Sequence, residues 1–213
     1  MVIVFEGSIN EDCIRYKHHS LVVFYLNNAK RHADIAMENH SEGVLLPDSI
    51  SAILFSTMCV EAFLNETAES LIDKEELKDF SFLRNEYKTK GKRSSVVKKV
   101  AIIFKHAFGV DVPDSLLSSV EELVNLRNNL VHYKLSDTAT KIIYPPLRNT
   151  QTESGESFMS VDFMQEPKAV IPPFVQKVSG ATAIKCYEIA DSVLAYWNEQ
   201  MEAKNDEGLP LQT

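Results

Sequence analysis

The chain has 213 residues, of which 45% are hydrophobic and 24% are charged, values typical of one globular domain with a sizeable core. Its formal net charge of −8 argues against a general nucleic-acid coat protein. The three cysteines are far apart and lack CxxC spacing, which indicates neither a disulfide framework nor a zinc site.

The amino-terminal sequence MVIVFEGSINEDC lacks the basic region and apolar core of a cleavable signal peptide. No later run reaches the roughly 20 apolar residues that a membrane span requires. We therefore expect a single cytoplasmic domain over residues 1–213 with no membrane association. Because only 7 residues are glycine, the composition favours long helices over a turn-rich sandwich.

The first two predicted helices occupy the amino-terminal third of the chain. Apolar residues fall at helical spacing from about Ile14 to His40, and Gly43 and Pro47 end this segment. The next helix begins in PDSIS, with Asp48 or Ser49 as N-cap. Its first half is apolar nearly all round, which predicts a central position in the fold.

Two more helices follow a charged segment that is typical of a broken helix and loop. The sequence SSVVKKVAIIFKHAFG predicts a third helix, with Ser94 or Ser95 as its cap and Gly109 as its stop. The fourth begins at Pro113 or Asp114 and runs through VEELVNLRNNLVHYKL. Its apolar stripe includes Leu130 and Val131, which we expect to face the core.

The pattern changes over residues 136–174, which contain five prolines and the alternating stretches KIIYPPL and SFMSVDFM. These stretches either pair as a hairpin across RNTQTESGE or form an irregular flap. A last helix is predicted over about 178–203, and residues 204–213 should fray. The predicted fold class is therefore all-α, a bundle of four or five helices with a Pro-rich insertion before the last helix.

The sequence RNNLVH, residues 127–132, carries the side chains best suited to chemistry. Asn128 and His132 are four residues apart and share one helix face, and the long side chain of Arg127 can reach the same edge. A guanidinium binds phosphate bidentately, and an imidazole, which titrates near neutrality, can accept or donate a proton. Asn128 could orient either group. These residues are a suitable set for metal-independent phosphoryl chemistry on RNA.

A structural role explains the same residues equally well from their spacing. A histidine near a helix C-terminus interacts favourably with the helix dipole, and Arg127 could pair with Glu121, Glu122 or Asp137.

The context of RNNLVH, which closes a helix in a small helical bundle after the apolar sequence VEAFLNE, resembles the HEPN superfamily (higher eukaryotes and prokaryotes nucleotide-binding). That family carries an R-x4-6-H motif, commonly with Asn after the Arg. The resemblance covers the helices over about 16–134 and the last helix, and it excludes the insertion. It implies a homodimeric endoribonuclease of a toxin-antitoxin or phage-defence system, with Arg127 and His132 catalytic and Asn128 supporting. Its RNA-cleaving cleft would be composite, with one motif from each subunit.

Glu61 and Asn65 of VEAFLNE are four residues apart on one helix face, and Glu61 interrupts an apolar run. A buried carboxylate needs a partner. Glu61 either reaches the cleft of Arg127 and His132, with Asn65 beside it, or it forms a salt bridge within the bundle or lies exposed.

The segment from Arg84 to Lys105 has eight basic residues and one acid, Glu86. It is either an ordinary solvated face or a phosphate-attracting patch. The candidate RNA-binding residues are Lys88, Lys90, Lys92, Arg93, Lys98 and Lys99.

The histidines lack carboxylates or cysteines at ligand spacing, so we predict no metal site and no cofactor. The leading hypothesis is thus a HEPN-like, metal-independent homodimeric endoribonuclease. The resemblance also implies an antitoxin or a nucleotidyltransferase as partner. Modification of a tyrosine two residues after the His, known in one branch of the family, is not carried over, because that position is Lys134 here. The rival hypothesis is a non-catalytic HEPN-like module that dimerises or binds a nucleotide or protein.

Overall fold

The computed structural model describes residues 3–4, 18–39, 47–144, 146–151, 153–155, 157–161 and 165–206. The helical elements are α1 (Val22–Glu38), α2 (Pro47–Leu71), α3 (Leu77–Phe82), the 3-10 turn η1 (Asn85–Tyr87), α4 (Ser95–Phe108), α5 (Asp114–Val131), α6 (Leu135–Thr138), α7 (Pro173–Lys177) and α8 (Gly180–Asp206). The strands are β1 (Ile3–Val4), β2 (His18–His19), β3 (Lys141–Ile143), β4 (Pro146–Gln151), β5 (Ser157–Val161) and β6 (Lys168–Val170).

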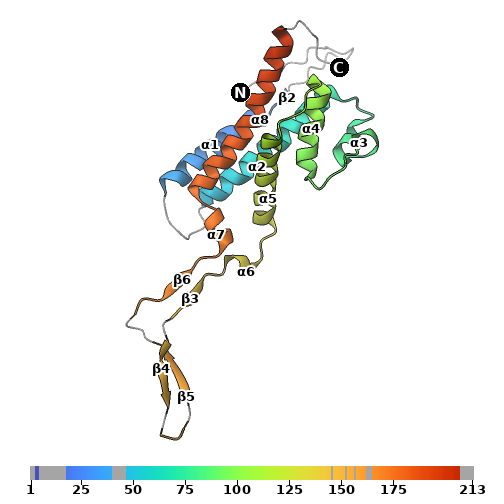
Figure 1. Cartoon of the computed structure of the whole chain (residues 1–213). Coiled ribbons are helices and arrows are strands. Elements are labelled where there is room, and N and C mark those ends of the chain that lie inside the picture. Colours follow the sequence, from blue (N-terminus) through green and yellow to red (C-terminus); the bar gives the residue numbers. More distant parts are fainter. Residues whose placement is uncertain are drawn as a thin grey trace.

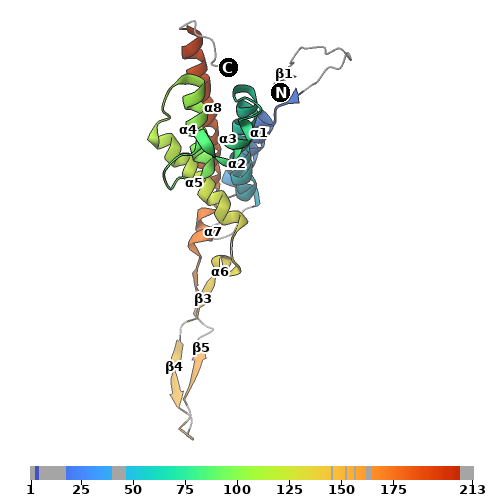
Figure 2. The same cartoon turned by 90° about the vertical axis from the view of Figure 1, so that its right-hand side faces the viewer.

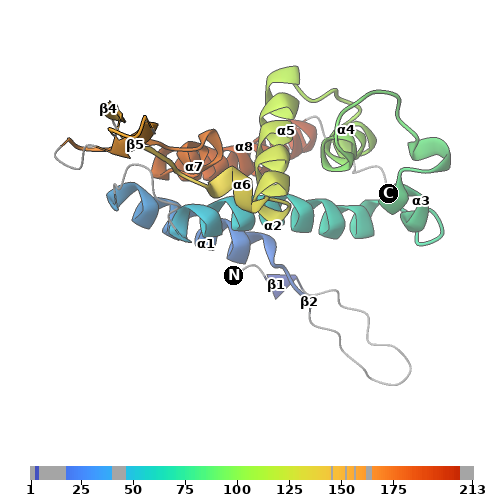
Figure 3. The same ribbon diagram turned by 90° about the horizontal axis from the view of Figure 1, so that it is seen from below.

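The body of the protein is a helical bundle organised around α2, so the all-α prediction is confirmed. Helices α1 and α8 lie alongside α2, and α4 and α5 also pack on it (Figures 1 and 3). Among the described elements, α2 alone is long and apolar enough to cross a membrane, although half of its most apolar window is buried inside the protein. Our expectation that no run reaches this length and composition was therefore wrong. The central position predicted for α2 is confirmed.

Small side chains allow α1, α2 and α8 to approach closely. The alanines at this junction have no exposed surface; they are Ala29, Ala33 and Ala36 of α1, Ala52 of α2 and Ala183 of α8. Gly180 begins α8 against the backbone of α1, where a Cβ would lie 2.5 Å from the carbonyl oxygen of Ala36. The other end of α8 packs through Trp197, whose ring lies 5.3 Å from that of Phe104 and 5.2 Å from that of Phe63.

The boundaries of α4 and α5 agree with their sequence signals. Ser94 precedes α4 with extended backbone, and Gly109 ends the helix at φ 71°, a left-handed conformation that glycine adopts without steric cost. Helix α5 begins at Asp114, directly after Pro113. The end at Gly109 and the start after Pro113 depend on local backbone chemistry, which is why the sequence predicts them well, whereas the side chain of Ser94 makes no cap hydrogen bond with α4.

The first helix is shorter than predicted. Residues 14–17 lie outside the described residues, and His18 and His19 form strand β2, which pairs with β1. The helix begins only at Val22, whose N–H donates to Oγ of Ser20 at 3.3 Å. Apolar spacing alone did not reveal that the histidines belong to a strand pair.

The carboxyl end of α8 extends further than predicted. Residues 204–206 are helical rather than frayed, because Nζ of Lys204 donates to the carbonyl oxygen of Ala107 at 2.7 Å and lies over the ring of Phe108. The rest of the predicted frayed tail lies outside the described residues.

The insertion forms a projection that we call the arm, defined as residues 135–177 from α6 to α7. A hairpin forms rather than an irregular flap: β4 pairs antiparallel with β5, and Leu147 lies opposite Ser160 in the register. Its strands differ from the predicted ones, because RNTQ of the predicted turn belongs to β4, and KII forms β3, which pairs with β6. A second antiparallel pair, β3 with β6, connects this hairpin to the body. The arm points away from the helical bundle in both side views (Figures 1 and 2).

Candidate functional site

The sequence RNNLVH lies where α5 leaves the core. Up to Val124 the inward side chains of α5 are buried between α2, α4 and α8, but Val131 is 51% exposed and His132 is exposed. The expectation that Val131 faces the core was therefore wrong, because the last turn of α5 extends beyond the neighbouring helices. The N–H of His132 donates to the carbonyl oxygen of Asn128 at 2.9 Å and closes this turn.

Arg127 and Asn128 are partly buried and contact each other. Nη1 of Arg127 donates to Oδ1 of Asn128 at 3.1 Å. Among the described residues, no carboxylate lies within ion-pair distance of Arg127. Since a guanidinium has five N–H donors in a planar fork, this one hydrogen bond orients Arg127 and leaves most of its donors for an anion.

The three carboxylates that could have neutralised Arg127 have other partners. Glu121 accepts from the N–H of Ser94 at 2.9 Å and from its Oγ at 3.0 Å, so it caps α4. Both carboxylate oxygens of Glu122 accept from Nζ of Lys185 at 2.7 Å. Asp137 accepts from the N–H of Lys134 at 2.8 Å. The ion pair that the structural alternative requires is therefore not formed.

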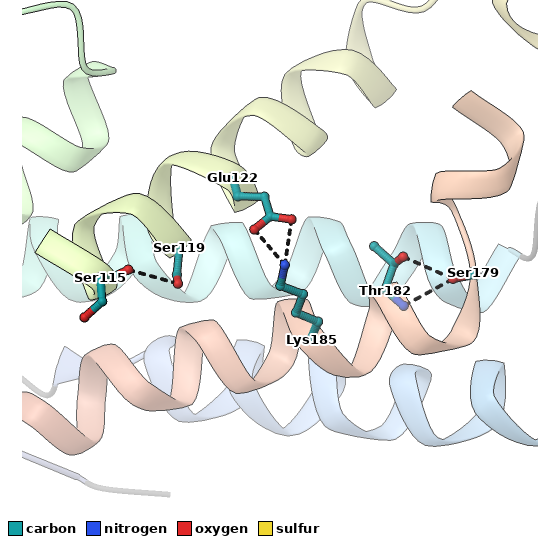
Figure 4. A network of polar contacts seen from close by, with 6 residues as sticks. All are labelled: Ser115, Ser119, Glu122, Ser179, Thr182 and Lys185. Carbon is teal, nitrogen blue, oxygen red and sulfur yellow. Dashed lines mark hydrogen bonds and ion pairs between the residues drawn. The ribbon is translucent and has the colours of Figure 1, made fainter. Parts of the chain in front are cut away.

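Figure 4 shows how the contact of Glu122 with Lys185 links α5 to α8. On α8, Oγ of Ser179 accepts from the N–H of Thr182 at 3.2 Å and caps the helix. On α5, Oγ of Ser119 donates to the carbonyl oxygen of Ser115 at 3.1 Å. These contacts fix the start of α8 and connect it to the middle of α5, one to two turns before Arg127.

His132 is followed at once by the base of the arm. The ring of Tyr133 stacks on that of Phe174 of α7, with centroids 6.5 Å apart and planes 13° apart. Tyr133 is 56% exposed and Leu135, the first residue of α6, is 83% exposed. The exposed imidazole therefore lies beside an apolar surface. Sequence reasoning missed this surface, although the apolar residues of HYKL beyond the motif were the available signal.

Glu61 and Asn65 are not brought to this end of α5. Glu61 is partly buried on α2, where its charge acts on Lys99 of α4. Burial lowers the pKa of Lys99 below its ordinary value, and Glu61 partly offsets the lowering. Asn65 is exposed. Since no hydrogen bond or ion pair among the described residues joins Glu61 to Arg127 or His132, the geometry favours an interaction within the bundle.

The candidate RNA-binding residues divide into two groups. Lys88, Lys90 and Lys92 are exposed in the loop before α4. The others contact the protein itself: Arg93 pairs with Asp114 at 2.9 Å, and Nζ of Lys99 lies 5.5 Å from the ring centroid of Phe80, while Lys98 is partly buried. Asp114 begins α5, about 27 Å along the helix axis from His132. Arg93, which follows these lysines, is therefore held at the opposite end of α5 from the motif.

No family model matches the chain, no curated protein matches its sequence, and no solved structure matches its fold. In the described part of the chain, no three His, Cys, Asp or Glu side chains converge closely enough to hold a metal ion.

Proposed function

We propose that this protein is a HEPN-like, metal-independent endoribonuclease that acts as a cytoplasmic homodimer. One observation carries the proposal: Arg127 is a partly buried residue whose guanidinium is oriented by Asn128 and has no carboxylate partner among the described residues, and the exposed His132 follows at the end of the same helix. A cation held in this way is available to an anion from outside the protein. The phosphodiester of RNA is such an anion.

The proposed reaction is a transesterification within the RNA. The 2′-oxygen attacks the adjacent phosphorus, the bond from phosphorus to the 5′-oxygen breaks, and a 2′,3′-cyclic phosphate and a free 5′-hydroxyl result. One imidazole takes the proton of the 2′-hydroxyl, and an imidazolium gives a proton to the leaving 5′-oxygen. Arg127 binds the non-bridging oxygens and stabilises the charge that develops on them.

The homodimer supplies the second proton-transfer group. One imidazole cannot easily accept and donate a proton in the same step, and a twofold-related copy would bring a second His132 to the cleft. The exposure of His132 at the end of α5 leaves it accessible to such a copy.

The test is RNA cleavage in the presence of EDTA by the wild type, Arg127→Ala and His132→Ala. Loss of the acid/base group should lower the rate of His132→Ala by about 100- to 10,000-fold, and loss of the charge-stabilising group should lower that of Arg127→Ala by about 100- to 1,000-fold. Arg31→Ala and His19→Ala are matched controls, because both residues are exposed and lie on other elements. Equal cleavage by wild type and both site variants, or no cleavage of any RNA by the wild type, would contradict the proposal.

The second candidate function is a non-catalytic binding or dimerisation module. The apolar surface of Val131, Tyr133 and Leu135 beside the motif favours it, because exposed apolar patches mark interaction sites. Such a protein would bind a partner with unchanged affinity after His132→Ala. In either case we place the protein in a toxin-antitoxin or defence system. Co-purification from its native host would then recover an antitoxin or a nucleotidyltransferase.

A further inference from the structure

Large exposed apolar side chains concentrate at one end of the molecule. Seven of the twelve such residues in the described part of the chain lie between the last turn of α5 and β6: Val131, Tyr133, Leu135, Ile142, Ile143, Tyr144 and Val170. Contiguous exposed apolar surface in a folded protein marks a surface that another molecule covers. The arm and its base are therefore the strongest candidate for an interaction surface.

The register of β3 with β6 separates two faces of the arm. Ile142 lies opposite Ala169, and directly opposed residues of an antiparallel pair share a face. The other face carries the pairs of Ile143 with Lys168 and of Lys141 with Val170. The first face is uncharged, whereas the second carries Lys141 and Lys168 beside the apolar Ile143 and Val170. Covering the face of Ile142 buries no lysine, so this face is the better suited to burial.

The strands of the arm lack support from their own chain. Every residue of β3 and β6 is exposed, and each strand has one neighbour. A two-stranded ribbon is marginally stable in water unless a third strand or a helix packs against it. The described helices of the same chain do not cover β3 and β6, so the surface of this ribbon is open to another molecule.

We propose that the arm packs, through the face of Ile142, on the helical body of a second copy of this chain. The choice of a second copy rests on the proposed function, in which two copies of His132 share one cleft. The arm begins at Leu135, three residues after His132, and points away from its own body (Figure 2). A partner placed across that cleft therefore lies along the path of the arm.

The dimensions fit this arrangement. Strands β3 and β4 have 3 and 6 residues, which together span about 30 Å at roughly 3.3 Å per residue. A body of about 170 residues has a radius of gyration of about 15 Å. The arm is thus long enough to cross the cleft and lie against the partner's helices. In a twofold dimer, the arm of each subunit would pack on the helical body of the other.

The test measures self-association by sedimentation equilibrium for the wild type, Ile142→Glu and Ile143→Glu. The two substitutions are chemically identical and adjacent, but they place the charge on opposite faces. The carboxylate that Ile143→Glu introduces would lie opposite Lys168, where an opposite-charge pair is tolerated. We expect a wild-type dimer, a rise of tenfold or more in the dimer dissociation constant for Ile142→Glu, and an unchanged constant for Ile143→Glu. Circular dichroism should be the same for all three proteins, because the substituted side chains lie outside the core.

A second measurement identifies what the arm touches. A photoreactive amino acid at position 142, in a mixture of ¹⁴N- and ¹⁵N-labelled protein, should cross-link to helical residues of the other isotopic form. A monomeric wild type, equal effects of the two substitutions, or cross-links confined to one chain would overturn the proposal. The result is independent of RNA cleavage: an arm-dependent dimer without cleavage contradicts only the ribonuclease, whereas cleavage by a dimer insensitive to Ile142→Glu contradicts only the arm.

Discussion

Gly180→Ala should destabilise the protein, although alanine is the better helix former. Gly180 is the first residue of α8 and lies directly against α1. A Cβ at this position would lie 2.5 Å from the carbonyl oxygen of Ala36, 2.8 Å from its carbonyl carbon and 2.8 Å from Cα of Met37. All three are backbone atoms, so a rotamer change cannot relieve the overlap, and the two helices would have to separate.

The two opposing effects can be compared in size. Replacing glycine by alanine inside a helix stabilises by about 1 kcal/mol at most. Overpacking a close contact costs about 1–3 kcal/mol, and the backbone position of this contact puts it at the upper end. We expect a net loss of about 2 kcal/mol in the free energy of unfolding. In a chain of this size that loss lowers Tm by roughly 4–8 °C.

Urea unfolding followed by circular dichroism measures this loss, and Ala181→Gly supplies the control. Ala181 is exposed on α8 and directly follows Gly180, so its replacement reports the helix propensity alone. If propensity governed the site, Gly180→Ala would stabilise the protein by about as much as Ala181→Gly destabilises it. A stabilised or unchanged Gly180→Ala variant would refute the close approach of α1 and α8.

Three further predictions concern side chains near the core and the motif. Glu121→Ala should lower the free energy of unfolding in urea by about 1–2 kcal/mol, because it removes the hydrogen-bond acceptor of Ser94. Replacement of the exposed Glu122 by Ala should lower it by at most about 0.5 kcal/mol, and equal losses would contradict the capping role of Glu121. Burial raises the pKa of the Cys59 and Cys186 thiols from 9.0 to about 12. The protonated thiols therefore stabilise the folded state below pH 9, and this stabilisation is lost as the pH rises toward 12. Cys186→Ala should lose helical circular dichroism less steeply than the wild type as the pH rises. A steeper loss would contradict the destabilising effect of ionising the Cys186 thiol. Under the proposed function, Asn128→Ala should lower kcat by roughly 10- to 100-fold, because it removes the hydrogen bond that orients the guanidinium of Arg127. This loss should be smaller than that of Arg127→Ala. An equal loss would mean that Asn128 itself contacts the RNA.

The sequence predicts those parts of the fold that depend on local chemistry. The start of α4 after Ser94, its end at Gly109 and the start of α5 at Asp114 agree with the structure. Backbone preferences within a few residues explain the ends at Gly109 and Pro113, whereas Ser94 caps no N–H of α4 with its side chain and instead contacts Glu121 of α5. A hairpin in the insertion also follows from alternation and a turn, but its strands do not, because β4 contains RNTQ of the predicted turn and KII pairs with β6. The strand at His18 and His19 was missed because it depends on pairing with β1, which lies far away in the sequence.

The environment of the candidate site could not be predicted in the same way. The residues of RNNLVH were evident from sequence, but the absence of a carboxylate at Arg127 among the described residues depends on which groups engage Glu121 and Glu122. Those groups, Ser94 and Lys185, lie 27 and 63 residues away from these carboxylates. Periodicity placed Val131 in the core because it cannot show where the neighbouring helices end. Long-range packing therefore decides which polar groups remain available to a ligand.

The stacking of Tyr133 on Phe174 joins the residue that precedes the arm to α7 at the arm's other end. A segment whose ends meet can be lengthened, shortened or exchanged while the helices on either side keep their places. Substitutions in the exposed strands of the arm are thus separated from the packing constraints on the core. Exchange of the arm as a unit would then change the surface offered to a partner while the helical body stays the same.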